Sequence, residues 1–167
     1  MNNEVVRVLK ERRSARNYLP KPIPREILED IIDCGRLAPS ANNSQPWVFV
    51  VVTEEAGKKE ISRLATWGKF IADAAACVAV FCERNNPHGV EDGSAATENI
   101  IIAAKSYGID SCWVAGYRRT YSDDIRKFLE VPGNYELISL VSLGYSDERP
   151  RRLKKELNEV LKWEKFH

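Results

Sequence analysis

The chain has 167 residues, with 25 lysines and arginines against 24 aspartates and glutamates, for a formal net charge of +1. Hydrophobic residues make up 44% of it and charged residues 29%, which is typical of a folded globular protein and unlike a disordered chain. This charge disfavours non-specific coating of nucleic acid, and no apolar run approaches the roughly 20 residues of a membrane span. We therefore expect one domain over residues 1–167, cytoplasmic, with neither a nucleic-acid nor a membrane partner.

In chain order, hydrophobic patterning predicts a helix over 3–12, a helix over 24–37, a strand over 47–53, a helix over 54–70, a strand over 77–82, a helix over 92–107, a strand over 111–115, a helix over 123–130, a strand over 137–143 and a helical tail. Pro24 suits a first helical turn, Gly108 a helix end, and Ser122 a helix cap. The apolar, β-branched runs 47–53 and 77–82 predict strands covered on both faces. Helices alternating with about four strands predict a central sheet with helices on both faces.

The cysteines and histidines limit the chemistry that the protein itself can supply. The cysteines are Cys34, Cys77, Cys82 and Cys112. They form no Cys-x-x-Cys pair, four free thiols suggest a reducing compartment, and plain packing in the core is the expected role of these residues. The only histidines, His88 and His167, are too few for a multi-histidine metal site. We expect no metal site, and we expect the reactive atoms to come from a bound cofactor.

Two basic clusters lie at opposite ends of the chain. The first comprises Arg7, Lys10, Arg12, Arg13, Arg16, Lys21 and Arg25. In the second, five of the seven residues 149–155 are lysine or arginine. If the clusters converge, a phosphate between them is the expected reason, because guanidinium groups match its oxygens in charge and geometry. The alternative is that each cluster is a solvated helix end. No glycine-rich phosphate loop occurs, so side chains would hold any phosphate.

Two further segments are candidates for a binding site. Residues 38–47 combine two prolines with uncharged donors and acceptors, which suits a planar heterocycle bearing carbonyls and ring nitrogens. The same composition also describes an ordinary connection between a helix and a strand. Gly116, at a predicted strand end, would let the backbone approach a ligand, but a turn glycine would look identical.

These motifs together resemble the nitroreductase-like FMN-dependent oxidoreductases. The resemblance rests on Arg12-Arg13-Ser14-x-Arg16, Pro22-Ile23-Pro24, Ala38-Pro39-Ser40-x-x-Asn43-x-Gln45-Pro46-Trp47, Glu98-Asn99, Gly108-Ile109-Asp110-Ser111-Cys112-Trp113 and Leu143-Gly144-Tyr145 before a basic stretch. It implies a three-layer α-β-α sandwich with a central, mostly antiparallel sheet, and a homodimer with one FMN at each end of the subunit interface. Residues 82–92 leave little room for a helical lid, so we expect a short lid region and an open site.

The resemblance also assigns residues to the cofactor. They are Arg12, Arg13, Ser14, Arg16, Pro39, Ser40, Ala41, Asn43, Gln45, Lys69, Ala115, Gly116, Arg151, Arg152 and Lys154. Arg12, Ser14 and Arg16 would hold the phosphate, the ribityl chain and the pyrimidine edge, and the last three residues would complete the phosphate site. The 39–41 segment would reach the flavin of the partner subunit, while Asn43 would bond to the ring system. Ala115 and Gly116 would present N–H groups to the N5/O4 edge, and Lys69 would contact the ring.

The activity that the resemblance implies is hydride transfer from NADH or NADPH, through flavin N5, to a small acceptor such as a nitroaromatic or a quinone. One shared site predicts ping-pong kinetics, and no residue is expected to act as a catalytic nucleophile. The alternatives are a non-catalytic flavin carrier or sensor, a specialised relative that removes halogens or cleaves flavin, and a small nucleic-acid-binding module. The apolar side chains of the tail would pack on the partner subunit or, equally, on their own chain; they are Leu157, Leu161, Trp163 and Phe166.

Overall fold

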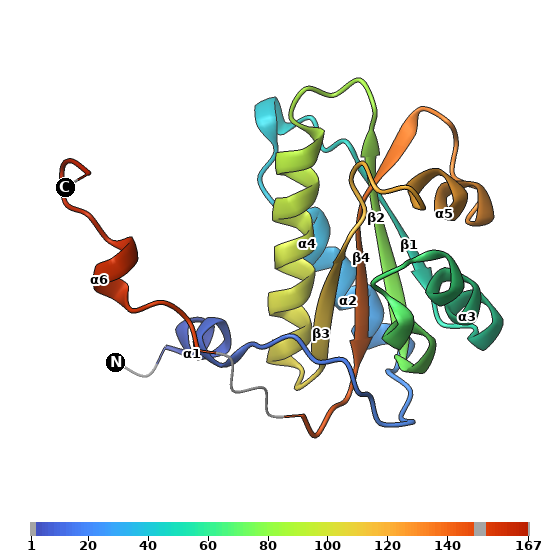
Figure 1. The fold of residues 1–167 in the computed structure, drawn as a ribbon, viewed down its shortest axis with the longest axis horizontal. Coiled ribbons are helices and arrows are strands. Elements are labelled where there is room, and N and C mark those ends of the chain that lie inside the picture. Colours follow the sequence, from blue (N-terminus) through green and yellow to red (C-terminus); the bar gives the residue numbers. More distant parts are fainter. Residues whose placement is uncertain (1–2, 149–152, 167) are drawn as a thin grey trace.

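The computed structural model describes residues 3–148 and 153–166 (Figure 1). In chain order the elements are α1 (Glu4–Glu11), α2 (Arg25–Arg36), the 3-10 turn η1 (Ala41–Asn43), β1 (Trp47–Val52), α3 (Glu55–Leu64), the 3-10 turn η2 (Lys69–Asp73), β2 (Ala76–Glu83), α4 (Gly89–Ser106), β3 (Asp110–Ala115), α5 (Ser122–Phe128), β4 (Tyr135–Gly144) and α6 (Leu157–Val160). No helix among these residues is both long and apolar enough to span a bilayer.

The four strands form one antiparallel sheet in the order β1-β2-β4-β3. Alternate residues of β2 face opposite sides, as strand geometry requires. Val78 and Val80 pack with α2 and α4, whereas Ala79 and Phe81 pack with α3, η2 and α5. Figure 1 shows α4 and α2 on one side of the sheet and α3 and α5 on the other. The predicted three-layer sandwich with a mostly antiparallel sheet is therefore confirmed.

A β-bulge interrupts the pairing of β2 with β4. Val80 lies opposite Ser139 and Phe81 lies opposite Leu137, so Ile138 is the extra residue. Its carbonyl oxygen accepts hydrogen bonds from the N–H groups of Gly116 (2.9 Å) and Tyr117 (3.1 Å). The bulge thereby fixes the chain just beyond the end of β3, next to two of the residues assigned to the cofactor.

Several element predictions need correction. The strand 47–53 is less buried than predicted: β1 is an edge strand of the described sheet, pairing only with β2, and Val48 and Val51 are exposed although both faces contact the core. The predicted helix 54–70 is α3 followed by a separate 3-10 turn. Ser122 begins α5 rather than capping it; its hydroxyl oxygen accepts the Arg119 N–H. The helical tail has a single four-residue helix, α6.

The two ends of the chain meet beside the sheet. Leu19 N–H donates to the Tyr145 carbonyl oxygen at 2.8 Å, and the Lys21 ammonium lies 4.0 Å from the centre of the Tyr145 ring. Glu148 accepts hydrogen bonds from the backbone N–H groups of Arg16 and Asn17. The Arg16 N–H bond holds the pKa of the Glu148 carboxyl below its usual value. Glu148, which directly precedes the second basic cluster in the sequence, is therefore in contact with the first basic cluster at Arg16.

Candidate cofactor-binding site

The segment from Arg12 to Arg16 lies along the free edge of β3. Ser14 forms a parallel bridge with Ser111, and Ala15 N–H donates to the Ser111 carbonyl oxygen at 3.0 Å. Strand β3 is the last strand of the sheet, so this short extended segment continues the sheet beyond it. The cationic and hydroxyl side chains of the predicted motif are therefore held by backbone pairing.

The three arginines of this segment differ in what they already contact. Arg13 donates from its guanidinium to the carbonyl oxygens of Lys10 (2.8 Å) and Arg12 (2.7 Å), which lie at the end of α1. Arg12 is half-buried, and its Nε lies 3.9 Å from the Glu98 carboxylate, too far for a hydrogen bond. The exposed Arg16 lies 5.7 Å from the centre of the Phe70 ring. Arg12 and Arg16 thus retain donors for a ligand, whereas Arg13 closes a helix end.

A cavity of about 240 Å³ lies where this segment meets the outer face of β3 and the η2 turn. It is lined by Arg16, Trp67, Phe70, Cys112, Trp113, Val114, Ala115, Arg119 and Tyr121. Two of the residues assigned to the cofactor, Arg16 and Ala115, therefore line one space. Its volume is below the roughly 300–1,000 Å³ of most ligand pockets. By itself this cavity is therefore smaller than a typical cofactor pocket.

Gly116 has a structural role that its sequence context leaves open. A Cβ built on it would lie 2.6 Å from the Leu137 side chain and 2.9 Å from the Ile138 backbone. Its N–H donates to the bulge, and its carbonyl oxygen accepts from Arg119 N–H at 3.2 Å and from the Ser122 hydroxyl. The Gly116 N–H predicted to face the flavin is thus already bonded within the protein. Packing against β4 is sufficient to explain the glycine.

Replacing Gly116 with alanine is expected to lower the free energy of unfolding by about 1–3 kcal/mol, because the added methyl must displace β4 backbone. Urea unfolding of the apoprotein measures this. Gly133→Ala is the matched control, since a Cβ there meets no described atom within 4 Å. Equal stability of the two variants would contradict the packing role of Gly116.

Lys69 and the segment 39–45 each have contacts of their own within the protein. The Lys69 ammonium donates to the carbonyl oxygens of Ser62 (2.9 Å) and Arg63 (3.1 Å), so it closes the end of α3 rather than pointing freely toward a ligand. The 39–45 segment connects α2 to β1. Its exposed part includes Asn43, a residue assigned to the flavin ring.

The Asn43 loop and the Arg12 segment contact different parts of α4. Ala41 N–H donates to Asp92 at 3.0 Å, and Arg12 lies near Glu98. At roughly 1.5 Å and 100° per residue, these two acids are about 9 Å apart along the helix and about 120° apart around it. Figure 1 shows η1 beside the first turns of α4 and the 12–16 segment crossing near its last turns. Within one chain the two predicted halves of the site therefore lie against different turns and different faces of α4.

The C-terminal cations are only partly described. Lys154 is exposed, whereas the predicted ligands Arg151 and Arg152 lie outside the described residues. Beyond them, the tail runs away from the sheet on the side where α1 lies (Figure 1). Leu153, Trp163 and Phe166 are 96%, 75% and 90% exposed, so these apolar side chains do not pack on the body of their own chain.

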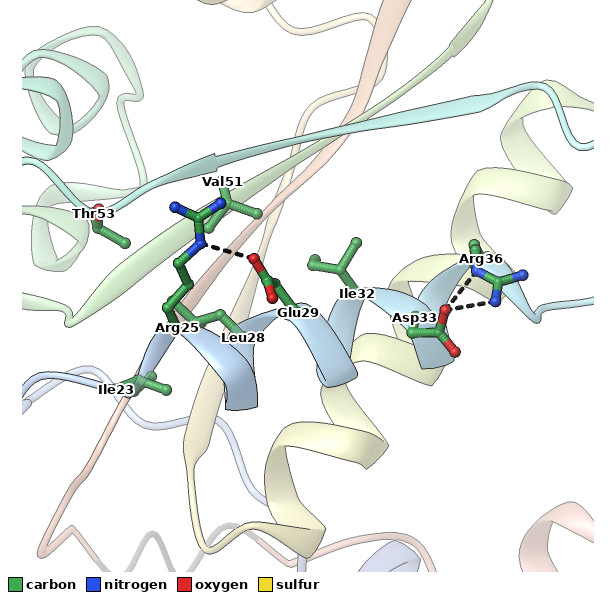
Figure 2. Close-up of a pocket in the computed structure, with 9 residues that line it drawn as sticks. All are labelled: Ile23, Arg25, Leu28, Glu29, Ile32, Asp33, Arg36, Val51 and Thr53. Atoms are coloured by element: carbon green, nitrogen blue, oxygen red, sulfur yellow. Dashed lines mark hydrogen bonds and ion pairs between the residues drawn. The ribbon is translucent and has the colours of Figure 1, made fainter.

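A larger cavity, of about 640 Å³, lies between α2 and β1. Figure 2 shows the apolar side chains that line it, Ile23, Leu28, Ile32 and Val51, and two ion pairs along α2. Both of its arginines are already paired, Arg25 with Glu29 at 2.7 Å and Arg36 with Asp33 at 2.6 Å. None of the residues assigned to the cofactor lines it. Its chemistry suits an apolar chain segment better than a phosphate.

Two residues with structural roles near the predicted site belong to none of the sequence motifs. Glu148 joins the chain ends, and Asp92 holds the Asn43 loop. A buried carboxylate in the first turn of a helix has a ready explanation in the helix dipole, so no sequence signal set Asp92 apart. The contact between Glu148 and Arg16 spans 132 residues and leaves no local pattern.

The family model that describes the nitroreductase family matches residues 9–88 and 63–145. A protein of Archaeoglobus fulgidus named "Putative NADH dehydrogenase/NAD(P)H nitroreductase" is 39% identical over 153 residues, covering 87% of this chain and 88% of the relative. One of the same name from Methanothermobacter thermautotrophicus is 31% identical, covering 88% and 80%. The chain therefore belongs to the nitroreductase family.

Solved structures agree with this placement. A protein of the same name from Bacteroides thetaiotaomicron superposes with a TM-score of 0.93 at 26% identity, covering 99% of this chain and all of the other. An FMN-dependent nitroreductase from Clostridium difficile superposes with a TM-score of 0.89 at 29% identity, covering 96% and 99%. The match extends over nearly the whole length of each protein.

Proposed function

We propose that the protein is an FMN-dependent oxidoreductase that uses NADH or NADPH to reduce a small acceptor. The observation that carries this proposal is the convergence of the chain ends. Arg12 and Arg16 lie beside β3 with donors to spare, and Glu148, which directly precedes the second basic cluster in the sequence, accepts hydrogen bonds from the Arg16 and Asn17 N–H groups. Two cationic segments brought together would repel each other unless an anion lay between them, and a phosphate satisfies guanidinium and ammonium donors together.

The cavity beside Arg16 supports a planar ring next to that phosphate. Phe70 and Trp113 supply apolar surface, while Arg16 supplies a cation at its rim. The carbonyl oxygens of Ala115 and Gly116 are tied down by the Tyr121 and Ser122 hydroxyls, so the backbone that lines the cavity is fixed before any ligand enters. The described donors and apolar faces thus fit FMN, with the phosphate on the arginines and the ring over the end of β3.

The chemistry that FMN supplies when bound is hydride transfer from NADH or NADPH to an acceptor such as a nitroaromatic or a quinone. The residues of the chain bind and orient. Arg12, Arg16 and Lys154 neutralise the phosphate, and a cation near the pyrimidine edge favours negative charge on the ring. Trp113 and Phe70 keep water from one side of it. Only residues 84–88 join β2 to α4, so this connection holds no helix that could cover the flavin. The electron donor and the acceptor would therefore bind in turn at the same open face of the ring.

We further propose that the enzyme is a homodimer whose tail packs on the partner subunit. The apolar side chains of the tail are exposed on their own chain, and contiguous exposed apolar surface of this kind marks an interaction site. The groove between α2 and β1 offers an apolar floor and a strand edge to receive it (Figure 2). A twofold arrangement would also let the Asn43 loop of one chain meet the Arg12 segment of the other.

A visible spectrum tests the enzymatic proposal. We expect the purified protein to bind added FMN, and we expect the flavin absorption to bleach on addition of NADH or NADPH without oxygen. The absorption should return when a nitroaromatic or a benzoquinone is added. Protein that takes up no FMN would overturn the proposal. Protein that binds FMN but bleaches with neither nucleotide would instead be a flavin carrier.

A further inference from the structure

The loop between α2 and β1 has an unusual backbone. Asn42, Asn43 and Gln45 have φ angles of 53°, 55° and 48°. Asparagine tolerates this left-handed region, but glutamine is rarely found there, and such residues persist only where the surroundings hold them. Within the loop, Ser40 Oγ accepts from Gln45 N–H, and Asn43 N–H donates to the Ser40 carbonyl oxygen, both at 3.0 Å. These bonds fix the shape of the loop but not its position on the protein.

Asp92 supplies the connection to the rest of the fold. It lies in the first turn of α4, is 5% exposed, and accepts the Ala41 N–H through Oδ1 at 3.0 Å. Its second oxygen, Oδ2, is buried and has no hydrogen-bond partner among the described residues. A further link, from the Asn86 amide to Ser44 Oγ at 3.2 Å, is exposed. Asp92 is therefore a buried anchor at the start of the loop, while just beyond its end the Pro46 carbonyl oxygen accepts the Glu83 N–H at 3.1 Å.

A carboxylate with one unpartnered buried oxygen is costly, and the positive end of α4 offsets part of that cost. An apolar side chain would fill this position without that cost, so the side-chain oxygen that accepts the Ala41 N–H is the feature to be explained. We propose that Asp92 is a positioning residue, whose buried carboxylate holds the Ser40–Gln45 loop, through Ala41, in the conformation that presents Asn43 to the flavin of the partner subunit. This inference rests on the proposed FMN function and goes beyond it by assigning a role on α4.

Three variants separate positioning from ordinary stability. Asp92→Ala removes the acceptor, and we expect FMN affinity, from quenching of flavin fluorescence, to fall at least about tenfold. Asp92→Asn keeps an acceptor oxygen for Ala41 N–H, so its affinity should stay within about threefold of the original. Thr97→Val is the matched control: it removes buried hydrogen bonds on α4, to Gly93 and Ser139 at 2.7 Å each, without touching the loop. It should lower the melting temperature and leave FMN affinity unchanged.

Removing the donor provides an independent check. Ser40 has φ −139° and ψ 153°, a conformation that a following proline accepts, so Ala41→Pro deletes the N–H with little other strain. It should weaken FMN binding as Asp92→Ala does, and the double variant should be no worse than either single variant. In the apoprotein, hydrogen exchange at Ser44 and Gln45 should quicken in Asp92→Ala and not in Thr97→Val.

Two results would overturn this role for Asp92. One is FMN affinity that falls no further in Asp92→Ala than in Thr97→Val. The other is additive loss in the double variant. Either leaves the proposed function intact provided that the unmodified protein binds FMN. Failure of the unmodified protein to bind FMN would instead reject the function itself, and loop exchange in the apoprotein would still report whether Asp92 anchors the loop.

Discussion

Replacing both Arg12 and Lys154 with alanine is expected to weaken FMN binding by at least about 100-fold. Each cation would lose a charge-assisted hydrogen bond to the phosphate, worth roughly 1.5–3 kcal/mol, so that each site contributes about tenfold or more. Arg12 is half-buried beside a carboxylate that it does not reach, which leaves its guanidinium donors for a ligand. Equilibrium dialysis against FMN, followed by flavin absorbance of the retained protein, measures the loss.

The control for that pair is Lys59→Ala with Lys127→Ala. It changes the net charge equally, but Lys59 already pairs with Glu55 on α3 and Lys127 lies on α5. The control should keep its FMN at physiological salt, because charges farther than a Debye length of about 8 Å are largely screened. If the Arg12 and Lys154 double variant retained FMN through dialysis as the control does, the phosphate would have to lie elsewhere.

Deleting residues 156–167 is expected to convert a dimer into a monomer and to weaken FMN binding at least about tenfold. The deletion leaves Lys154 in place, so any loss of FMN reflects the interface rather than the phosphate contacts. Its basis is the exposure of the tail, where Leu157 and Val160 are 70% and 61% accessible on their own chain. Sedimentation velocity at several protein concentrations gives the mass.

A full-length variant separates apolar packing from chain length. Leu157→Ser with Trp163→Ser keeps the full length of the tail but removes two of its large apolar side chains. This variant should be monomeric, as the deletion variant is expected to be. Glu156→Gln with Lys162→Gln alters only exposed charged groups and should remain dimeric. A truncated protein with the mass of the intact one would show that the tail does not hold the subunits together. An intact protein that is itself monomeric would reject the dimer.

The elements were predicted correctly from the sequence where a hydrophobic pattern was compatible with only one structure. Residues 77–82 read as a strand buried on both faces and are so, within β2. The equally apolar run that begins at Trp47 became an edge strand, because its hydrophobicity does not record how many neighbours pair with it. The prediction of a helical tail was largely wrong for a related reason. The spacing of its apolar residues suits a helix, but a short helix is marginal in water unless it packs on another surface.

The site was predicted as a set of residue types, and the structure separates their tasks. Nothing in Arg12-Arg13-Ser14-x-Arg16 distinguishes the arginine that closes α1 from those that remain available, because that depends on which carbonyl oxygens lie nearby. The polar loop around Asn43 was recognisable, but its left-handed backbone and its anchor at Asp92, 51 residues beyond Ala41, were not. Local sequence indicates which secondary structure a segment prefers, whereas contacts between residues far apart in the sequence depend on the tertiary fold.

The Asn43 loop and the Arg12 segment lie against different parts of α4, and this affects how two inactive variants of the protein would behave when they are produced together. If each complete site draws on two copies of the chain, two proteins with different inactivating substitutions, one at either end of that helix, would still share one intact site when they associate. Partial recovery in such mixed pairs is a property that enzymes with self-contained sites lack.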